Sequence, residues 1–282
     1  MTDWQPKISI VVPAHNEEER LDGFFQRLQK IEYPSEKWEF LLVDNGSADN
    51  TLKKARALGI EPLFEKKIGA YAARNTGVRR ATGEVIAFTD ADCLPEPGWL
   101  REGVRALANA ELVSGQIEFF DEFPTLASRY SKTQWGQQEK TTKENQSAAA
   151  GNLFIRRAFF LELGGFLEEN LYIEDTRFTS AATKKGARLV HAPLAIVRHP
   201  AHGTLKELLE KCRQFGFSLG ESRRAAQTEW RDLLPGVREL VQFYHRAKLK
   251  KREVVPAAAL IWMCKLAKAR GQRDFTLGRR QR

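Results

Sequence analysis

The sequence predicts an α/β protein with a mostly parallel sheet, helices on both faces of the sheet, and a helical C-terminal extension. Three observations support this fold class. Strand-like and helix-like segments alternate along the first 92 residues. The strand-like segments are short, apolar and rich in β-branched residues, as strands buried on both faces are. Polar residues follow these strands, and alternation of this kind is typical of parallel strands joined through helices.

The first 92 residues contain four predicted strands and three predicted helices. The strands are expected at residues 8–12, 39–43, 62–65 and 85–89, and the helices at 17–31, 48–58 and 70–81. Acidic residues in the first turn favour the first helix, and Asp and Asn favour the start of the second. Because the carboxyl ends of parallel strands meet at one edge, ligands are expected there.

Residues 99–202 change to a mixed pattern of helices and strands. Helices are expected at 99–108, 124–140, up to 163 and at 175–185, with strands at 111–120 and 151–155 and a pair of short strands around Pro193. From residue 204 the pattern is helical, with breaks at Pro235-Gly236 and near Pro256. We therefore expect one domain over 1–202, divided at residue 98, and a helical extension over 203–282.

Composition indicates an ordinary globular protein: 282 residues, 42% hydrophobic and 29% charged. The three cysteines are widely spaced and form neither a metal-binding pattern nor a disulfide framework, so a reducing cytosol is expected. The N-terminus has no signal-peptide pattern, and no apolar run approaches the roughly 20 residues that cross a bilayer. The predicted location is cytoplasmic.

Positive charge is concentrated in the C-terminal segment. Residues 203–282 carry 19 basic and 8 acidic residues, a net charge of +11, so the preceding 202 residues carry −2 of the total of +9. An anionic partner is expected for such a segment, either a membrane surface or a nucleic acid. The apolar stretch 254–264 between cationic flanks fits a helix lying on anionic lipid. A helix packed on the body of the protein, with a basic rim, fits it equally well.

The strand at residues 85–89 ends in two carboxylates, Asp90 and Asp92. Alternate residues of an extended chain point the same way, so both carboxylates can face one hard cation or a metal-bound phosphate. A single motif of this kind is most often an acidic turn. The other polar segments decide between the two interpretations.

Several further segments stand in a fixed order around this pair of acids, and together they resemble one known family. They are Pro13-Ala14-His15-Asn16-Glu17-Glu18, residues 43–51, Gly69 to Gly77, Phe88 to Leu100, Ala150 to Arg157, Gly164-Gly165-Phe166, Glu174-Asp175 and Val197-Arg198-His199. This series, over residues 7–199, resembles the family 2 glycosyltransferases, which are inverting enzymes with the GT-A fold. Residues 1–98 correspond to that family's nucleotide-sugar half and 99–202 to its acceptor half.

The resemblance implies that the first half binds a nucleoside diphosphate sugar, with a UDP-sugar as the first expectation. The side chains and backbone implied in this binding are Pro13, Ala14, Asn16, Glu17, Asp44, Asn45, Arg74 and Asp90. Asn45 stands where many relatives carry a second aspartate, and an amide there can favour a different nucleobase. Arg74 presents a fork of donors suited to phosphate oxygens, although an arginine on a helix surface is the ordinary alternative.

The resemblance also implies a metal site and a catalytic base. Asp92, with Asp90 and His199, would bind Mn²⁺ or Mg²⁺, which neutralises charge on the departing diphosphate. Asp175 would be the general base, and Glu174 is the second candidate. An aspartate at a helix start is also a good N-cap, and both roles can hold. Gly151 and Asn152 would lie on the acceptor side, where the implied acceptor is a glycan or lipid-linked hydroxyl of a cell-envelope polysaccharide.

Two other classes of protein remain as alternatives. A nucleotidyltransferase can use a similar sheet, but it has no evident use for the distant Glu174-Asp175 pair. A nucleic-acid-binding protein would use the basic extension, yet the aromatic residues there stand at helical core spacing, so nucleic acid is not the expected partner.

Overall fold

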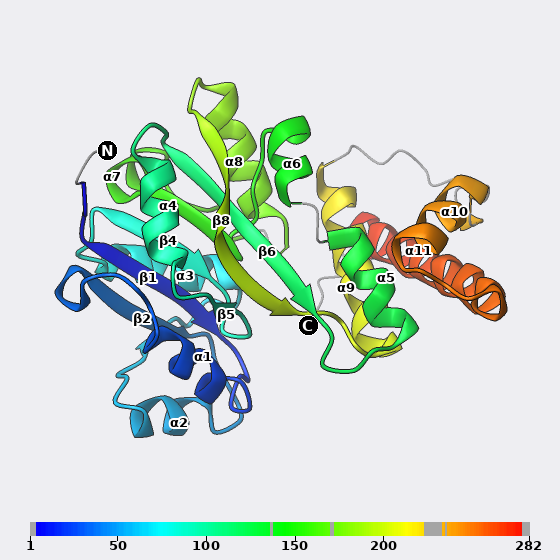
Figure 1. Ribbon diagram of the computed structural model, residues 1–282, viewed down its shortest axis with the longest axis horizontal. Coiled ribbons are helices and arrows are strands. Elements are labelled where there is room, and N and C mark those ends of the chain that lie inside the picture. The colour runs from blue at the N-terminus through cyan, green and yellow to red at the C-terminus, as the bar shows by residue number, and fades with distance from the viewer. Residues whose placement is uncertain (1–3, 136–137, 170–171, 223–232, 235, 278–282) are drawn as a thin grey trace. The chain divides into compact units, whose positions relative to one another are not determined.

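The structure is a computed structural model that describes residues 4–135, 138–169, 172–222, 233–234 and 236–277 (Figure 1). The chain divides into two compact units, each described by itself. The sheet unit comprises residues 1–118 and 137–199, and the helical unit comprises residues 119–136 and 200–282. The predicted boundary after residue 202 lies close to the break after His199, but residues 119–136 group with the C-terminal helices.

The described residues form one eight-stranded sheet with the order β3-β2-β1-β4-β7-β6-β8-β5. Strands β1, β2, β3 and β4 pair in parallel, whereas β7 pairs antiparallel with β4 and β6, and β5 pairs antiparallel with β8. The predicted α/β fold class is confirmed, with the parallel arrangement confined to the first half. The strand bounds are β1 Ile8–Ala14, β2 Trp38–Asp44, β3 Leu63–Phe64, β4 Val85–Thr89, β5 Leu94–Pro95, β6 Leu112–Phe120, β7 Asn152–Arg156 and β8 Leu189–Pro200.

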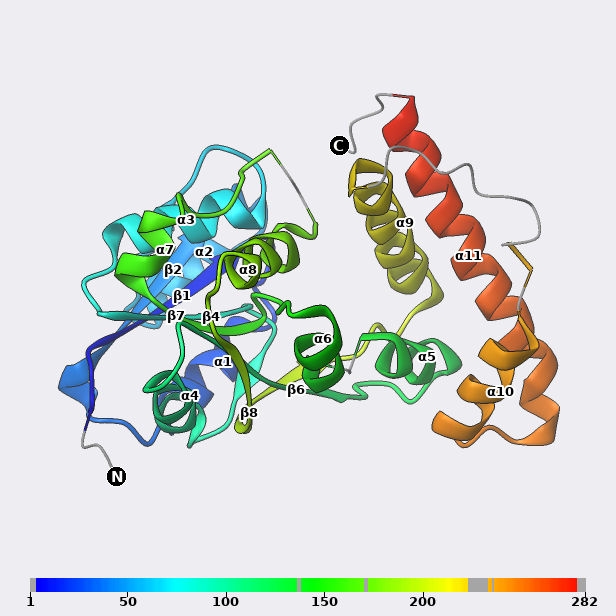
Figure 2. The same ribbon diagram turned by 90° about the horizontal axis from the view of Figure 1, so that it is seen from above.

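Helices cover both faces of the sheet, as predicted. Figure 2 shows α3, α7 and α8 on one side and α1 and α4 on the other. On the first side Phe88, Phe160 and Phe178 belong to one buried cluster, and each such ring contributes about 1.5–3 kcal/mol by leaving water. The helix bounds in this unit are α1 Leu21–Leu28, α2 Thr51–Ala57, α3 Ala70–Arg80, α4 Trp99–Leu107, α6 Gln138–Asn145, α7 Arg157–Glu162 and α8 Glu174–Lys184, with a 3₁₀ turn at Ser35–Lys37.

Two local predictions about this unit were wrong, and one short strand was missed. The first helix begins at Leu21 instead of residue 17, because the backbone N–H of Glu17 donates to Thr51 Oγ1 at 2.8 Å and the preceding loop is held to its neighbour. The two short strands expected around Pro193 are one continuous strand, β8. Pro193 is exposed in it, and proline is tolerated in a strand where no ladder N–H is required. The two-residue strand β5 was not predicted.

The helical unit consists of α5 Leu126–Trp135, α9 Leu205–Ser222, α10 Val237–Arg246, a 3₁₀ turn at Lys251–Glu253 and α11 Val254–Thr276. The helix expected at 124–140 corresponds to α5 and the beginning of α6, and residues 136–137 between them lie outside the described residues. The predicted break near Pro256 lies before it, and Pro256 occupies the first turn of α11, where its missing N–H costs no helical bond. The core of the helical unit combines Tyr130 of α5 with residues of α9, α10 and α11. No helix among the described residues is long and apolar enough to cross a membrane.

Candidate active site

Three parallel strands deliver polar residues to one edge of the sheet. Ala14 and Asp44 are paired in the register of β1 and β2, and the backbone N–H of Asn45 donates to the Ala14 carbonyl at 2.9 Å. Asp90 directly follows β4, which is the other parallel neighbour of β1. The predicted meeting of these strand ends is therefore present.

Asp44 is fully buried, and its two carboxylate oxygens differ in their surroundings. Oδ2 accepts hydrogen bonds from the backbone N–H groups of Gly46 at 3.1 Å and Ser47 at 3.3 Å. Oδ1 accepts none from the residues that the structure describes. Buried carboxylate oxygens are rarely left without a donor, so Oδ1 is suited to accept an N–H or O–H group from a ligand.

The Asn45 side chain makes its hydrogen bonds within the protein. Its Nδ2 donates to the carbonyls of Glu65 at 3.0 Å and Lys67 at 2.8 Å, and its Oδ1 accepts from the Gly69 N–H at 2.7 Å. Both amide hydrogens are thus used. The side chain holds the loop that leads into α3.

Asn16 and Glu17 connect the loop after β1 with the loop after β2. The Asn16 side chain accepts from the Ala48 N–H at 2.8 Å, and its backbone N–H donates to Ser47 Oγ at 3.0 Å. Burial, together with the charges of Asp92 and Asp90, raises the pKa of Glu17 to about 7, although Arg20 opposes this shift. Glu17 therefore stands beside the two acids that follow β4.

A cluster of four potential metal ligands comprises Asp90, Asp92, Cys93 and His199, whose ligand atoms all lie within 4.8 Å of one another. Asp92 Oδ2 lies 3.5 Å from His199 Nε2. The unpredicted strand β5 explains this approach, because its pairing of Leu94 with Arg198 sets the end of β8 against the segment after β4. Cys93 was not among the predicted ligands.

The donor set of this cluster fits a hard divalent cation. Asp92 Oδ1 is buried and has no partner among the described residues, so it is available to a cation. Burial and the charges of Asp92 and Asp90 raise the pKa of the Cys93 thiol well above its usual range. Its soft sulfur is in addition a poor match for a hard cation, which prefers oxygen ligands. Two carboxylates and one imidazole then remain, a set suited to Mn²⁺ or Mg²⁺ completed by substrate oxygens.

Arg74 supplies a buried positive charge next to this cluster. Its guanidinium is ion-paired with Asp90 Oδ1, while its Nε–H has no acceptor among the described residues. Burial disfavours the charged form of Arg74, but the charges of Asp90 and Asp175 outweigh that effect and raise its pKa. The side chain thus stays cationic where phosphate oxygens are expected.

Asp175 lies in the first turn of α8, and the structure brings it close to the acids after β4. Its Oδ2 accepts from the Ala150 N–H at 2.7 Å, and its Oδ1 accepts from the Thr176 N–H at 2.8 Å. A Cβ atom added to Gly151 would lie 3.2 Å from Asp90 Oδ2. Ala150 therefore bonds to Asp175, and the neighbouring Gly151 has Asp90 on the side where a side chain would project.

Tyr71 also contacts Asp175 and was not predicted as a site residue. Its hydroxyl donates to Asp175 Oδ1 at 2.9 Å. Burial and the Asp175 charge raise the pKa of Tyr71 well above its usual range, so the phenol keeps its proton. The one available signal was its position three residues before Arg74, which places both on one face of α3.

Two predicted site residues, Glu174 and Asn152, have hydrogen bonds within the protein fold. Glu174 is 3% exposed, and its Oε1 accepts from the Leu167 N–H at 3.1 Å. Asn152 is fully buried: its Oδ1 accepts from Trp99 Nε1 at 2.9 Å, and its Nδ2 donates to the carbonyls of Gln116 and Ala195. All hydrogens of the Asn152 amide are therefore donated inside the protein.

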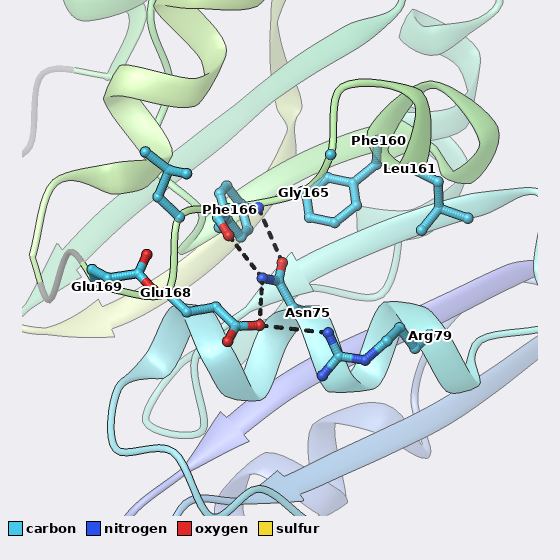
Figure 3. Close-up of a pocket in the computed structure, with 10 residues that line it drawn as sticks. Asn75, Arg79, Phe160, Leu161, Gly165, Phe166, Glu168 and Glu169 are labelled. Atoms are coloured by element: carbon cyan, nitrogen blue, oxygen red, sulfur yellow. Dashed lines mark hydrogen bonds and ion pairs between the residues drawn. The ribbon is translucent and has the colours of Figure 1, made fainter.

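The Gly164-Gly165-Phe166 turn packs against α3 beside a cavity of about 370 Å³ (Figure 3). Asn75 fixes the turn, because its side chain accepts from the Phe166 N–H at 3.0 Å and donates to the Phe166 carbonyl at 2.8 Å. Gly165 has φ +73°, and a Cβ there would lie 2.9 Å from Asn75 Oδ1, so glycine is required. The Phe166 ring packs against the Tyr71 ring, with 5.2 Å between the two ring centroids.

The sequence is similar to those of known glycosyltransferases. Residues 9–163 match the model of the Glycosyl transferase family 2. Glycosyltransferase AglE of Haloferax volcanii is 34% identical over 230 residues, which cover 78% of this chain and 75% of that protein. The probable glycosyltransferase YdaM of Bacillus subtilis is 28% identical over 210 residues, covering 68% of this chain and 50% of that protein.

Solved structures show the same fold. The mannosyltransferase PcManGT of Pyrobaculum calidifontis, determined with GDP-Man and Mn²⁺, has a TM-score of 0.64 at 17% identity, covering 99% of this chain and 89% of that one. TarS residues 1–349 of S. aureus, determined with UDP, has a TM-score of 0.56 at 17% identity, covering 98% and 93%. The residues that match the family model include the carboxyl ends of β1, β2 and β4. This chain therefore belongs to glycosyl transferase family 2, and it is a glycosyltransferase with a GT-A type of fold.

Proposed function

We propose that this glycosyltransferase transfers a sugar with inversion from a nucleoside diphosphate sugar to an acceptor hydroxyl, with Asp175 as the general base. The observation that carries the proposal is that the Ala150 N–H donates to Asp175 at 2.7 Å, while a Cβ on the next residue, Gly151, would lie 3.2 Å from Asp90 Oδ2. A carboxylate that binds the donor and a carboxylate that takes a proton are thus within reach of one reacting centre.

Donor binding is assigned to atoms whose hydrogen-bonding capacity is unused. Asp44 Oδ1 accepts a donor group of the nucleobase or ribose, and Arg74 Nε–H donates to a phosphate oxygen. Pro13 and Ala14 contribute backbone at the same edge, and Asn45 acts by holding the loop before α3. The structures of PcManGT with GDP-Man and TarS with UDP support a nucleotide donor. A UDP-sugar remains the first expectation, with a GDP-sugar as the alternative.

A divalent cation, Mn²⁺ or Mg²⁺, would be held by Asp92, Asp90 and His199. The ion offsets the charge that develops on the leaving diphosphate. The presence of Mn²⁺ in the PcManGT complex supports this assignment. Glu17 faces the same acids and would gain its negative charge more readily once a cation balances them.

Asp175 acts on the acceptor. It takes the hydroxyl proton while the acceptor oxygen attacks the anomeric carbon from the face opposite the diphosphate, so the configuration inverts. Glu174 supports the loop at Leu167, and Gly151 permits close approach because it carries no side chain. Asn152 holds the strand end below it.

We further propose a glycan or lipid-linked acceptor, with the helical unit placed on an anionic membrane surface. Val255 and Trp262 are 78% and 44% exposed and lie seven positions apart on one face of α11. The exposed cations Lys250, Lys251 and Arg252 immediately precede them. An apolar face with adjacent cations is the pattern of an interfacial helix.

The proposal is tested by incubating the purified chain with Mn²⁺ and, in separate assays, UDP-glucose, UDP-galactose, UDP-N-acetylglucosamine and GDP-mannose. The quantity measured is the release of the nucleoside diphosphate, UDP or GDP. Asp92→Ala and Asp175→Asn should each lower the rate about 10²-fold or more, with unchanged thermal unfolding. Asp22→Asn, which removes a carboxylate paired with Lys54 on α2, is the matched control and should retain activity. Full activity in both site variants would contradict the mechanism.

A further inference from the structure

We propose that Tyr71 is a positioning residue that makes Oδ2 of Asp175 the oxygen that receives the acceptor proton. The inference rests on the proposed role of Asp175 as the general base. Tyr71 belongs neither to the acids nor to the arginine of the proposed mechanism, and its hydrogen bond leaves one oxygen of Asp175 for the proton.

The two oxygens of the Asp175 carboxylate differ in the number of hydrogen bonds that they accept. An ionised carboxylate offers about four acceptor sites, two on each oxygen. On Asp175, Oδ1 accepts from the Tyr71 hydroxyl at 2.9 Å and from the Thr176 N–H at 2.8 Å, so both of its sites are taken. Oδ2 accepts from the Ala150 N–H at 2.7 Å and retains one site. Oδ2 is therefore the oxygen on the Ala150 side, and a Cβ added to the next residue, Gly151, would lie 3.2 Å from Asp90 Oδ2.

The Tyr71 hydroxyl is held rigidly. Tyr71 is 4% exposed, its ring packs against Phe166, and the Arg74 guanidinium lies 5.4 Å from the ring centroid. Phe166 is itself fixed by two hydrogen bonds between its backbone and Asn75. A donor with so little freedom loses little further entropy when it orients the carboxylate.

One helix, α3, contacts both the carboxylate proposed to bind the donor and the carboxylate proposed to take the acceptor proton. Tyr71 and Arg74 lie three residues apart on α3, where Tyr71 contacts Asp175 and Arg74 contacts Asp90. Side chains of a single helix therefore bind both carboxylates. In the transfer step the acceptor O–H bond breaks and its proton passes to Asp175 Oδ2. The acceptor oxygen bonds to the anomeric carbon, and the bond to the diphosphate breaks with its electron pair.

Tyr71→Phe tests the inference, because it removes only the hydroxyl and keeps the ring contacts. With a UDP-sugar or GDP-mannose and Mn²⁺, kcat for diphosphate release should fall about 10- to 100-fold while the donor KM stays within about twofold. The acidic limb of the pH profile of kcat should move to higher pH, because a hydrogen bond to the charged form of the base is lost. Tyr33→Phe, which removes a hydroxyl that donates to the Pro6 carbonyl at 2.8 Å, is the matched control and should change neither quantity.

A double-mutant cycle separates positioning from general structural support. If Tyr71 acts through Asp175, Tyr71→Phe should cost no further activity in an Asp175→Asn background. Additive losses, or an unmoved pH profile in Tyr71→Phe, would overturn the positioning role. Full activity of Asp175→Asn by itself would instead refute the proposed function, so the two failures are distinguishable.

Discussion

Asp92 Oδ2 and His199 Nε2 lie 3.5 Å apart, although 106 residues separate the two positions in the chain. The pairing of β5 with β8 creates this proximity. Because both side chains are largely buried and belong to one cluster with Asp90, the proposed cation would have ligands from both halves of the sheet unit.

His199→Gln should therefore weaken Mn²⁺ binding about 10- to 100-fold, since one ligand or ligand-orienting group is removed while both carboxylates remain. Mn²⁺ affinity measured by calorimetry or electron paramagnetic resonance provides the readout. His245→Gln changes an exposed histidine of α10 and should have no effect. Equal affinities in wild type and His199→Gln would remove His199 from the site.

Glu17 should make the metal-free protein less stable as pH rises. Its pKa is about 7 when folded against an ordinary value of 4.5, so between these values the folded chain retains a proton that the unfolded chain has lost. The contribution of Glu17 to the free energy of unfolding is then largest below pH 4.5. It declines as the pH rises to about 7, by roughly 3 kcal/mol at most.

Urea denaturation in EDTA at about pH 5 and pH 7.5 should show a smaller decline for Glu17→Gln than for wild type. Glu18→Gln is the neighbouring control, because that carboxylate bonds to Asn50 at the surface. Identical pH dependence in wild type and Glu17→Gln would show that Glu17 is not held in the raised state.

Asn152→Ala should lower stability by about 2–4 kcal/mol, because Trp99 Nε1 and two buried carbonyls lose their partner. The midpoint of urea denaturation measures this loss. If Asn152 holds the strand end and does not contact the acceptor, activity per folded molecule should change little. Asn50→Ala at the surface serves for comparison. A large loss of kcat with unchanged stability would instead favour direct contact with the acceptor.

Gly216→Ala should disrupt the helical unit. A Cβ there would lie 1.9 Å from the Lys268 carbonyl oxygen on α11, so the helices α9 and α11 would have to separate at a cost of about 1–3 kcal/mol. Thermal unfolding followed by circular dichroism would report the change. Gly203→Ala adds a Cβ whose nearest contacts are 3.9 Å away, and it should be tolerated. Similar unfolding of both variants would argue against close packing at Gly216.

Trp262→Ser should reduce binding to vesicles that contain phosphatidylglycerol about tenfold, because an exposed ring on the apolar face of α11 is lost. Co-sedimentation with the vesicles measures the binding, and added salt should weaken it further. Leu194→Ser removes a similarly exposed apolar side chain, 59% exposed on β8, and should not alter binding. No binding by the wild-type chain would refute the membrane assignment.

The sequence alone determined the fold class, the strand-end positions of Asp44, Asp90 and Asp92, and the family. Those features depend on local periodicity and on the order of motifs, and parallel strands bring their carboxyl ends together regardless of side-chain detail. Only the tertiary structure decided which atoms have unused hydrogen-bonding capacity. Asn45 and Asn152 look like ligand-binding amides in sequence, yet their amide hydrogens are donated to carbonyls elsewhere in the chain.

The role of Tyr71 could not be predicted from the sequence either, because its contact with Asp175 joins positions 104 residues apart. Nothing in the residues around Tyr71 indicates that partner, since long-range hydrogen bonds depend on how helices pack across the sheet. Sequence patterns therefore identified the chemical groups, and packing determined which of their oxygens and nitrogens remain available for substrate.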